Sequence, residues 1–216
     1  MDDRLYTKRT AMCDLFEKYR SDKSIWHNYT TLYDFLFRSL DLVDKPINLF
    51  ELGLGTNNVH LPSNMGANGN PGASMYAFSE YFPNANIYGA DIDMSILFQK
   101  DRIKTFFCNQ TSPQTIANMW AKIDVEFDIL IEDGLHKAFA NIIFLDNSFH
   151  KVKKGGIYII EDILNEDIQA IVDHLQTPAY DNVAFKAVVT LPMEMEWTRG
   201  TGRVNRVDNT LAILVR

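Results

Sequence analysis

Cysteine is rare in this chain, and long apolar runs and clusters of positive charge are missing. The two cysteines, Cys13 and Cys108, stand far apart and match no metal-binding or redox spacing. No apolar run approaches the roughly 20 residues that a membrane-spanning helix requires, and the first residues lack the apolar core of a signal peptide. We therefore expect a cytoplasmic protein that does not act on a membrane.

The charge balance argues against a further class of partner. Lysine and arginine number 21 against 28 aspartates and glutamates, which gives a formal net charge of -7. Affinity for a nucleic-acid backbone relies on clustered lysine and arginine, so we expect no nucleic-acid partner. At 216 residues, with 46% hydrophobic residues, the chain has the size of one domain with a full core.

The sequence divides at Pro46. Apolar residues recur at helical spacing in residues 1–45, and we expect this N-terminal helical segment to lie on the substrate side of the site, as a lid. Residues 46–216 alternate apolar strand-like runs with helical stretches, which indicates a mostly parallel sheet covered by helices on both faces. The expected strands are 47–52, 85–90, 103–107, 127–131 and 157–160, and the expected helices are 74–82, 95–100, 113–122, 138–152 and 166–175.

The C-terminal part breaks this alternation. Two strand-like runs, 183–191 and 211–215, have no convincing helix between them, and we expect them to close the sheet as an antiparallel pair. The chain is thus predicted to be an α/β protein with a Rossmann-like, seven-stranded, mostly parallel sheet. Such a closing hairpin is typical of class I methyltransferases, whereas nicotinamide-binding sheets continue in parallel.

A glycine-rich turn follows the first expected strand. Glu51 precedes Gly53 and Gly55, and glycines at the carboxyl end of a strand let the backbone pass close to a ligand. The dinucleotide-binding motif requires a third glycine and an immediate helix, whereas Asn58 and a loop to Gly72 follow here. The turn therefore disfavours a dinucleotide, and a plain strand-to-loop turn is the alternative to a ligand site.

Polar residues also end the next two strands. Asp91, and after it Asp93, are placed to accept hydrogen bonds from the ribose of an adenosine-type ligand, unless they cap the following helix. Asn109 and Gln110 follow the third strand and offer donors and acceptors to an adenine edge. A helix N-cap at residues 111–112 is the alternative there.

The most specific signal lies at the ends of the fourth and fifth strands. Asp133 ends one strand, and Glu161 and Asp162 end the other, so the three carboxylates converge if the strands are neighbours. They would repel one another without a cation, and hard oxygen ligands favour Mg²⁺, Mn²⁺ or Ca²⁺ over zinc. His136 would lie beside that ion, where a neutral imidazole can remove a proton from a hydroxyl. Helix capping by one or two of the acids is the alternative.

Together these motifs resemble those of a known enzyme family. The sequence is similar to the macrocin and mycinamicin sugar O-methyltransferases, a group that includes rhamnosyl O-methyltransferases and cephalosporin-hydroxylase-like proteins. The similarity spans roughly residues 20–165. It is carried by residues 51–55, 72–74, 81–83, 88–93, 132–136 and 154–162, and by an N-terminal motif of Ser21, Asp22, Lys23, His27, Asn28, Tyr29 and Tyr33.

The resemblance implies S-adenosylmethionine (SAM) as methyl donor, a Mg²⁺-type ion on Asp133, Glu161 and Asp162, and His136 as general base, with Asp133 also catalytic. It implies a homo-oligomer and a small-molecule acceptor, a hydroxyl of a sugar or sugar-linked precursor of an antibiotic, capsule or surface polysaccharide. The residues implied to bind SAM are Glu51, Gly53, Gly55, Ser74, Asp91, Asp93, Asn109, Gln110 and Asp133.

Two departures and three alternatives accompany this interpretation. The loop at residues 56–71 is longer than the family pattern, and Asn109 stands where an acid is common. Arg199, Arg203 and Arg206 form a basic loop, which suggests an anionic acceptor unless the loop is simply solvated. The alternatives are a methyltransferase of a phosphorylated or phosphoramidate capsule precursor, a nicotinamide-dependent oxidoreductase, and a non-catalytic SAM-binding protein.

Overall fold

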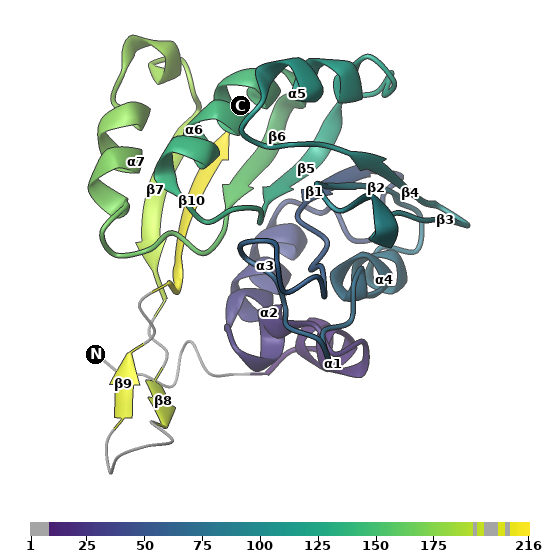
Figure 1. Ribbon diagram of the computed structural model, residues 1–216. Coiled ribbons are helices and arrows are strands. Elements are labelled where there is room, and N and C mark those ends of the chain that lie inside the picture. Colours follow the sequence, from purple (N-terminus) through teal and green to yellow (C-terminus); the bar gives the residue numbers. More distant parts are fainter. Residues whose placement is uncertain (1–8, 192–193, 197–202, 206–207) are drawn as a thin grey trace.

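A mixed eight-stranded sheet forms the centre of the molecule (Figure 1). A computed structural model describes residues 9–191, 194–196, 203–205 and 208–216. The order of the strands across the sheet is β3-β4-β2-β1-β5-β6-β10-β7, and β8 and β9 pair with each other apart from it. The strands are β1 (Asn48–Leu52), β2 (Asn86–Asp91), β3 (Gln99–Lys100), β4 (Ile103–Phe107), β5 (Phe127–Glu132), β6 (Val152–Ile160), β7 (Phe185–Thr190), β8 (Glu194–Glu196), β9 (Arg203–Asn205) and β10 (Thr210–Val215).

The pairing confirms the predicted Rossmann-like class. Strands β4, β2, β1, β5 and β6 run parallel, and β10 is antiparallel to both β6 and β7. The parallel strands are apolar because helices cover both of their faces: Ile129, Leu130 and Ile131 of β5 are all fully buried. Their carboxyl ends meet at one edge of the sheet, and this edge carries the site.

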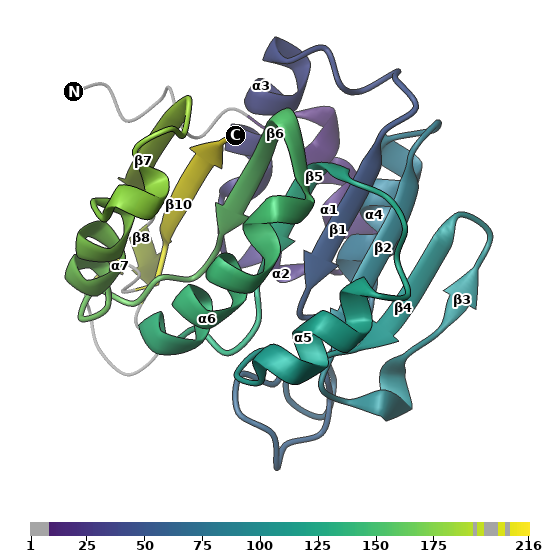
Figure 2. The ribbon, with the colours of Figure 1, turned by 90° about the horizontal axis from the view of Figure 1, so that it is seen from above.

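The described residues also form seven helices and three short 3₁₀ turns, and the first three helices precede β1. Helices α1, α3 and α4 share a core with one face of the sheet, through Phe16, Phe37 and Phe78. Helices α5, α6 and α7 pack on the other face, as Figure 2 shows. The helices are α1 (Ala11–Lys18), α2 (Asp22–Ile25), α3 (Tyr29–Ser39), α4 (Ala73–Tyr81), α5 (Pro113–Trp120), α6 (Ala138–Ser148) and α7 (Ile168–Leu175), with the 3₁₀ turns η2 (Met94–Ile96), η3 (Phe149–Lys151) and η4 (Pro178–Tyr180).

The structure corrects one local expectation. Residues 95–100 are not a helix but the turn η2 followed by the two-residue strand β3, which is why the sheet has eight strands and not seven. Asp93 caps the turn by accepting from the Ser95 amide, and the Thr105 amide of β4 then donates to Phe98 O and draws the segment into the sheet. The short helix α2 lies within the polar stretch that begins at Ser21.

No helix within the described ranges is both long and apolar enough to cross a membrane. Arg199 and Arg206 of the basic loop lie outside the described residues, and Arg203 falls in β9.

Candidate active site

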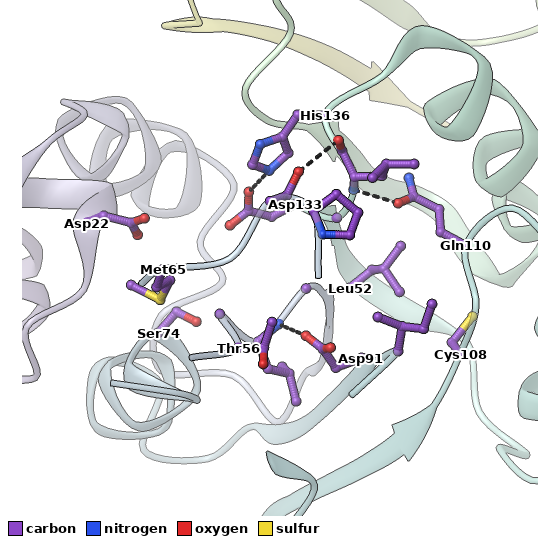
Figure 3. A pocket seen from close by; sticks show the side chains of 18 of the residues that line it. Asp22, Leu52, Thr56, Met65, Ser74, Asp91, Cys108, Gln110, Asp133 and His136 are labelled. Atoms are coloured by element: carbon purple, nitrogen blue, oxygen red, sulfur yellow. Dashed lines mark hydrogen bonds and ion pairs between the residues drawn. The ribbon is translucent and has the colours of Figure 1, made fainter. Parts of the chain in front are cut away.

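A cavity of about 310 Å³ opens at the carboxyl ends of β1, β2, β4 and β5 (Figure 3). Its walls come from the turns after these strands, from α2, and from the loop at residues 56–72. Most residues predicted to bind the methyl donor line it: Gly53, Gly55, Ser74, Asp91, Asn109, Gln110 and Asp133, together with His136. Glu51 lies in the protein interior with no exposed surface.

The two glycines of the first turn are required by the protein backbone itself. Gly53 has φ +90°, and a Cβ atom there would lie 1.8 Å from the carbonyl oxygen of Asp133. Gly55 has φ +76°, and its Cβ would meet the Met65 sulfur at 2.0 Å. Both positions therefore need glycine, because other residues seldom adopt such φ values and would also clash. The turn packs directly on the Asp133 turn and under the 56–72 loop.

The two aspartates at the end of β2 are both hydrogen-bonded within the protein. Asp91 accepts hydrogen bonds from the amides of Leu54 (2.7 Å) and Asp93 (2.8 Å), so it fixes the glycine turn. Asp93 accepts from Thr56 Oγ1 at 2.5 Å and from the Ser95 amide at 2.9 Å. Asp93 thus performs the capping role that was the alternative to ribose binding, whereas Asp91 remains on the cavity wall.

The polar pair after β4 is also engaged internally. The amide group of Gln110 donates to Glu132 Oε1 at 2.6 Å and accepts from the Leu135 amide at 2.7 Å, so it holds the Asp133 turn in place. Asn109 Oδ1 accepts from the Thr111 amide at 3.0 Å. The expected N-cap is present as well, since Ser112 caps α5.

The acids at the ends of β5 and β6 converge as expected, but the cation between them is an ammonium group. Lys23 of α2 is 2% exposed, and its Nζ lies 2.6 Å from Glu161 Oε2 and 3.2 Å from Glu51 Oε1. It also pairs with Asp133 Oδ2. Burial lowers the pKa of Lys23, but the surrounding carboxylates outweigh it and raise the pKa well above its ordinary value. Lys23 is therefore charged, and it joins three strands of the sheet.

A second group of ligand atoms faces away from Lys23. His136 Nε2 lies 3.0 Å from Asp133 Oδ1 and 3.8 Å from Asp162 Oδ2, and the ligand atoms of the three residues lie within 4.8 Å of one another. The two carboxylates are oxygen ligands of the kind that a Mg²⁺ or Mn²⁺ ion prefers, and the imidazole lies beside them. Glu161, the other expected ligand, is instead held by Lys23 and by Tyr33, whose hydroxyl donates to Glu161 Oε1 at 2.5 Å.

His136 is held in a charged setting. Its φ of +55° and that of Asp162, +53°, lie in the left-handed region, which costs of the order of 1–3 kcal/mol for such residues. Burial lowers the pKa of His136, but the hydrogen bond to Asp133 and the charge of Asp162 raise it to about 9. The neutral imidazole expected from the sequence therefore requires a further positive charge near Asp133 and Asp162.

The N-terminal segment supplies site residues to which sequence reasoning gave no role. Besides Lys23 and Tyr33, the Tyr29 hydroxyl donates to Asp162 Oδ1 at 2.6 Å, and His27 Nδ1 lies 3.4 Å from the same atom. All four are buried. Their signal was the N-terminal motif of the family resemblance, in which a lysine, a histidine and two tyrosines precede or begin an aromatic-rich helix.

Comparison with known proteins supports the resemblance. No model of a known protein family matches the sequence. The chain is 31% identical over 153 residues to the 8-demethyl-8-(2-methoxy-alpha-L-rhamnosyl)-tetracenomycin-C 3'-O-methyltransferase of Streptomyces olivaceus. The alignment covers 69% of this chain and 36% of the relative. It is 28% identical over 159 residues to the mycinamicin VI 2''-O-methyltransferase of Micromonospora griseorubida. That alignment covers 73% of this chain and 37% of the relative.

Solved structures show the same fold. The MycE methyltransferase of the mycinamycin biosynthetic pathway, in complex with Mg and SAH, superposes with a TM-score of 0.67 at 21% identity, covering 97% of this chain and 55% of that one. The chain thus spans little more than a third of the length of the curated relatives it matches. It is similar in sequence to sugar O-methyltransferases, and its fold is that of class I methyltransferases.

Proposed function

We propose that this chain, a relative of the sugar O-methyltransferases with the class I methyltransferase fold, transfers the methyl group of SAM to a hydroxyl of a sugar or sugar-linked precursor. One observation carries the proposal: Asp133, Asp162 and His136 converge beside a cavity whose wall is the glycine turn after β1. The site for the donor and the groups that would activate an acceptor are thus parts of one edge of the sheet.

The cavity suits SAM, whose sulfonium supplies an electrophilic methyl group. We assign its adenosine to the end formed by Asp91, Ile92, Cys108 and Asn109, where strands β2 and β4 finish. Asp91 is already bonded to two amides, but each carboxylate oxygen has a further lone pair for a ribose hydroxyl. The backbone of Gly53 and Gly55 then passes under the donor and directs its methyl group toward Asp133.

We assign proton removal to His136. An ionised Asp133 can only accept a hydrogen bond, so the His136 nitrogen 3.0 Å away, Nε2, carries a proton. Nδ1 is then the ring atom left to take a proton from the acceptor hydroxyl. Asp133 fixes the orientation of the ring, and the surrounding turn keeps the histidine at the cavity wall.

We assign a Mg²⁺-type ion to Asp133 and Asp162. When bound, such an ion supplies the positive charge that acidifies an acceptor hydroxyl and offsets the carboxylates that hold the pKa of His136 near 9. Glu161 stands behind these two residues, neutralised by Lys23.

The experiment is incubation of the protein with SAM and a panel of nucleotide sugars and phosphorylated precursors, with product masses read by mass spectrometry. Methylation of a sugar hydroxyl supports the proposal, and methylation of a phosphate or phosphoramidate oxygen would establish the alternative acceptor. EDTA should abolish turnover and Mg²⁺ restore it, and full activity in chelator would refute the metal assignment. Thermal stabilisation by NAD⁺ but not by SAM or S-adenosylhomocysteine would refute methyl transfer altogether. A homo-oligomeric state and a cytoplasmic location stay predictions from the sequence.

A further inference from the structure

Three acids among the described residues line the cavity, and one of them is left without a hydrogen bond or an ion pair. Asp91 is bonded to two backbone amides, and Asp133 is paired with Lys23 and His136. The carboxylate of Asp22, in contrast, accepts no hydrogen bond and forms no ion pair within the described part of the chain, although its charge contributes to the raised pKa of the neighbouring Lys23. A partly buried carboxylate that faces a cavity can accept the N–H donors of a cationic group on a ligand.

We propose that Asp22 binds the α-ammonium group at the amino-acid end of the methyl donor, an inference that rests on the proposed function. SAM carries two groups of positive charge, the sulfonium and this ammonium, and only the ammonium has N–H donors that a carboxylate can accept. The N-terminal segment then takes part in binding the donor, besides facing the acceptor.

The position of Asp22 fits the length of the donor. Asp22 and Ser74 line the end of the cavity opposite Cys108 and Gln110, where we place the adenosine, and Figure 3 shows the Asp22 carboxylate directed inward from the helical side. A donor with its adenosine at one end must extend its amino-acid chain across the glycine turn toward the other. Asp22 is the acid that it meets there.

A second acceptor lies at the same end. Ser74 Oγ donates its only proton to Glu51 Oε2 at 2.6 Å, so toward the cavity this hydroxyl can only accept. An ammonium offers three donors, and Asp22 and Ser74 together provide two acceptors for it.

The backbone holds Asp22 in position. Its neighbours Ser21 and Lys23 are each 2% exposed, and Lys23 is fixed by the acid cluster. The carbonyl oxygen of Asp22 accepts from the amides of Trp26 (2.8 Å) and His27 (3.0 Å). The backbone thus holds Asp22 at the cavity wall before a ligand arrives, and this reduces the entropic cost of binding.

The test compares two ligands that differ in the amino-acid end. S-adenosylhomocysteine carries the ammonium and carboxylate, whereas 5'-methylthioadenosine keeps the adenosine and sulfur but lacks both. Isothermal titration should show that Asp22→Asn weakens binding of S-adenosylhomocysteine about 10-fold or more and leaves binding of 5'-methylthioadenosine unchanged. Asp124→Asn, which alters an exposed acid outside the cavity, should change neither.

Each other outcome overturns something specific. Unchanged affinity of Asp22→Asn for S-adenosylhomocysteine would overturn the inference and leave the proposed function intact. Equal weakening of both ligands would also overturn it, since a loss of cavity shape would then explain the effect. If the unaltered protein binds neither ligand, the proposed function itself fails.

Discussion

Replacing Lys23 by methionine removes the charge from the acid cluster and keeps nearly the same volume. The ammonium lies 2.6 Å from Glu161 Oε2 and 3.2 Å from Glu51 Oε1 and pairs with Asp133, so two buried carboxylates and one partly buried carboxylate lose their common partner. Breaking a buried ion pair by removing one partner costs about 3–5 kcal/mol. For a domain of this size the melting temperature should fall by roughly 6–20 °C.

The assay is urea unfolding followed by circular dichroism near neutral pH, with linear extrapolation to water. Lys18→Met is the matched control, because Lys18 is 55% exposed and pairs with Glu80 at the surface, where solvent screens an ion pair and the pair adds little to stability. Adding Glu161→Gln to Lys23→Met should recover part of the loss, since one of the stranded charges is removed. A free energy of unfolding within 1 kcal/mol of the unaltered protein would refute the view that Lys23 neutralises this cluster.

Three further substitutions test the site. His136→Ala should lower kcat about 100-fold or more and leave the affinity for S-adenosylhomocysteine nearly unchanged, as measured by steady-state kinetics and titration; equal losses in both would indicate a structural role. Gly53→Ala should destabilise the fold by at least about 2 kcal/mol in urea unfolding, because φ is +90° and the new Cβ would meet Asp133 O; a neutral effect would contradict the packing. Burial raises the pKa of Glu51 to about 7, so the protonated group stabilises the fold below pH 4–5 and this contribution is lost as the pH rises through 7. Glu51→Gln cannot ionise at this position and so does not lose stability in this way. The free energy of unfolding of this variant, relative to that of the unaltered protein, should rise by up to about 3 kcal/mol between pH 5 and 8, and a difference independent of pH would contradict this.

The sheet and the edge that carries the site were predictable because both depend on local patterns. Buried parallel strands are apolar runs that stop abruptly, and in β1, β5 and β6 the stop is marked by Gly53, Asp133 and Glu161. A family resemblance then placed the chemistry at that edge. The helix expected at residues 95–100 was wrong, because Thr105 of the neighbouring strand draws this segment into the sheet and no local signal reports that contact.

The partners of the acids were beyond sequence reasoning. Ser21–Ser24 is a polar stretch, and a polar stretch predicts an exposed break, yet Lys23 is almost completely buried. A lysine is rarely buried unless it pairs with opposite charges. Here those charges belong to Asp133 and Glu161, which lie 110 and 138 residues further along the chain. The same holds for Gln110. Its side-chain amide suggests ligand binding, but this amide is hydrogen-bonded to Glu132 and to the Leu135 backbone.

The position of Lys23 in the chain, far before its partner acids, has a consequence for the order in which the protein folds. Lys23 leaves the ribosome long before Asp133 and Glu161, so the segment that carries it must wait for the later strands before its charge can be buried. Contacts between such distant positions close late, because the loop between them must be ordered first. We expect the acid cluster to be among the last parts of the domain to form, with the strands β1, β5 and β6 paired beforehand and the N-terminal helices docking onto them. Exchange of this N-terminal segment between related enzymes should therefore fail unless the incoming segment carries a lysine at the same position.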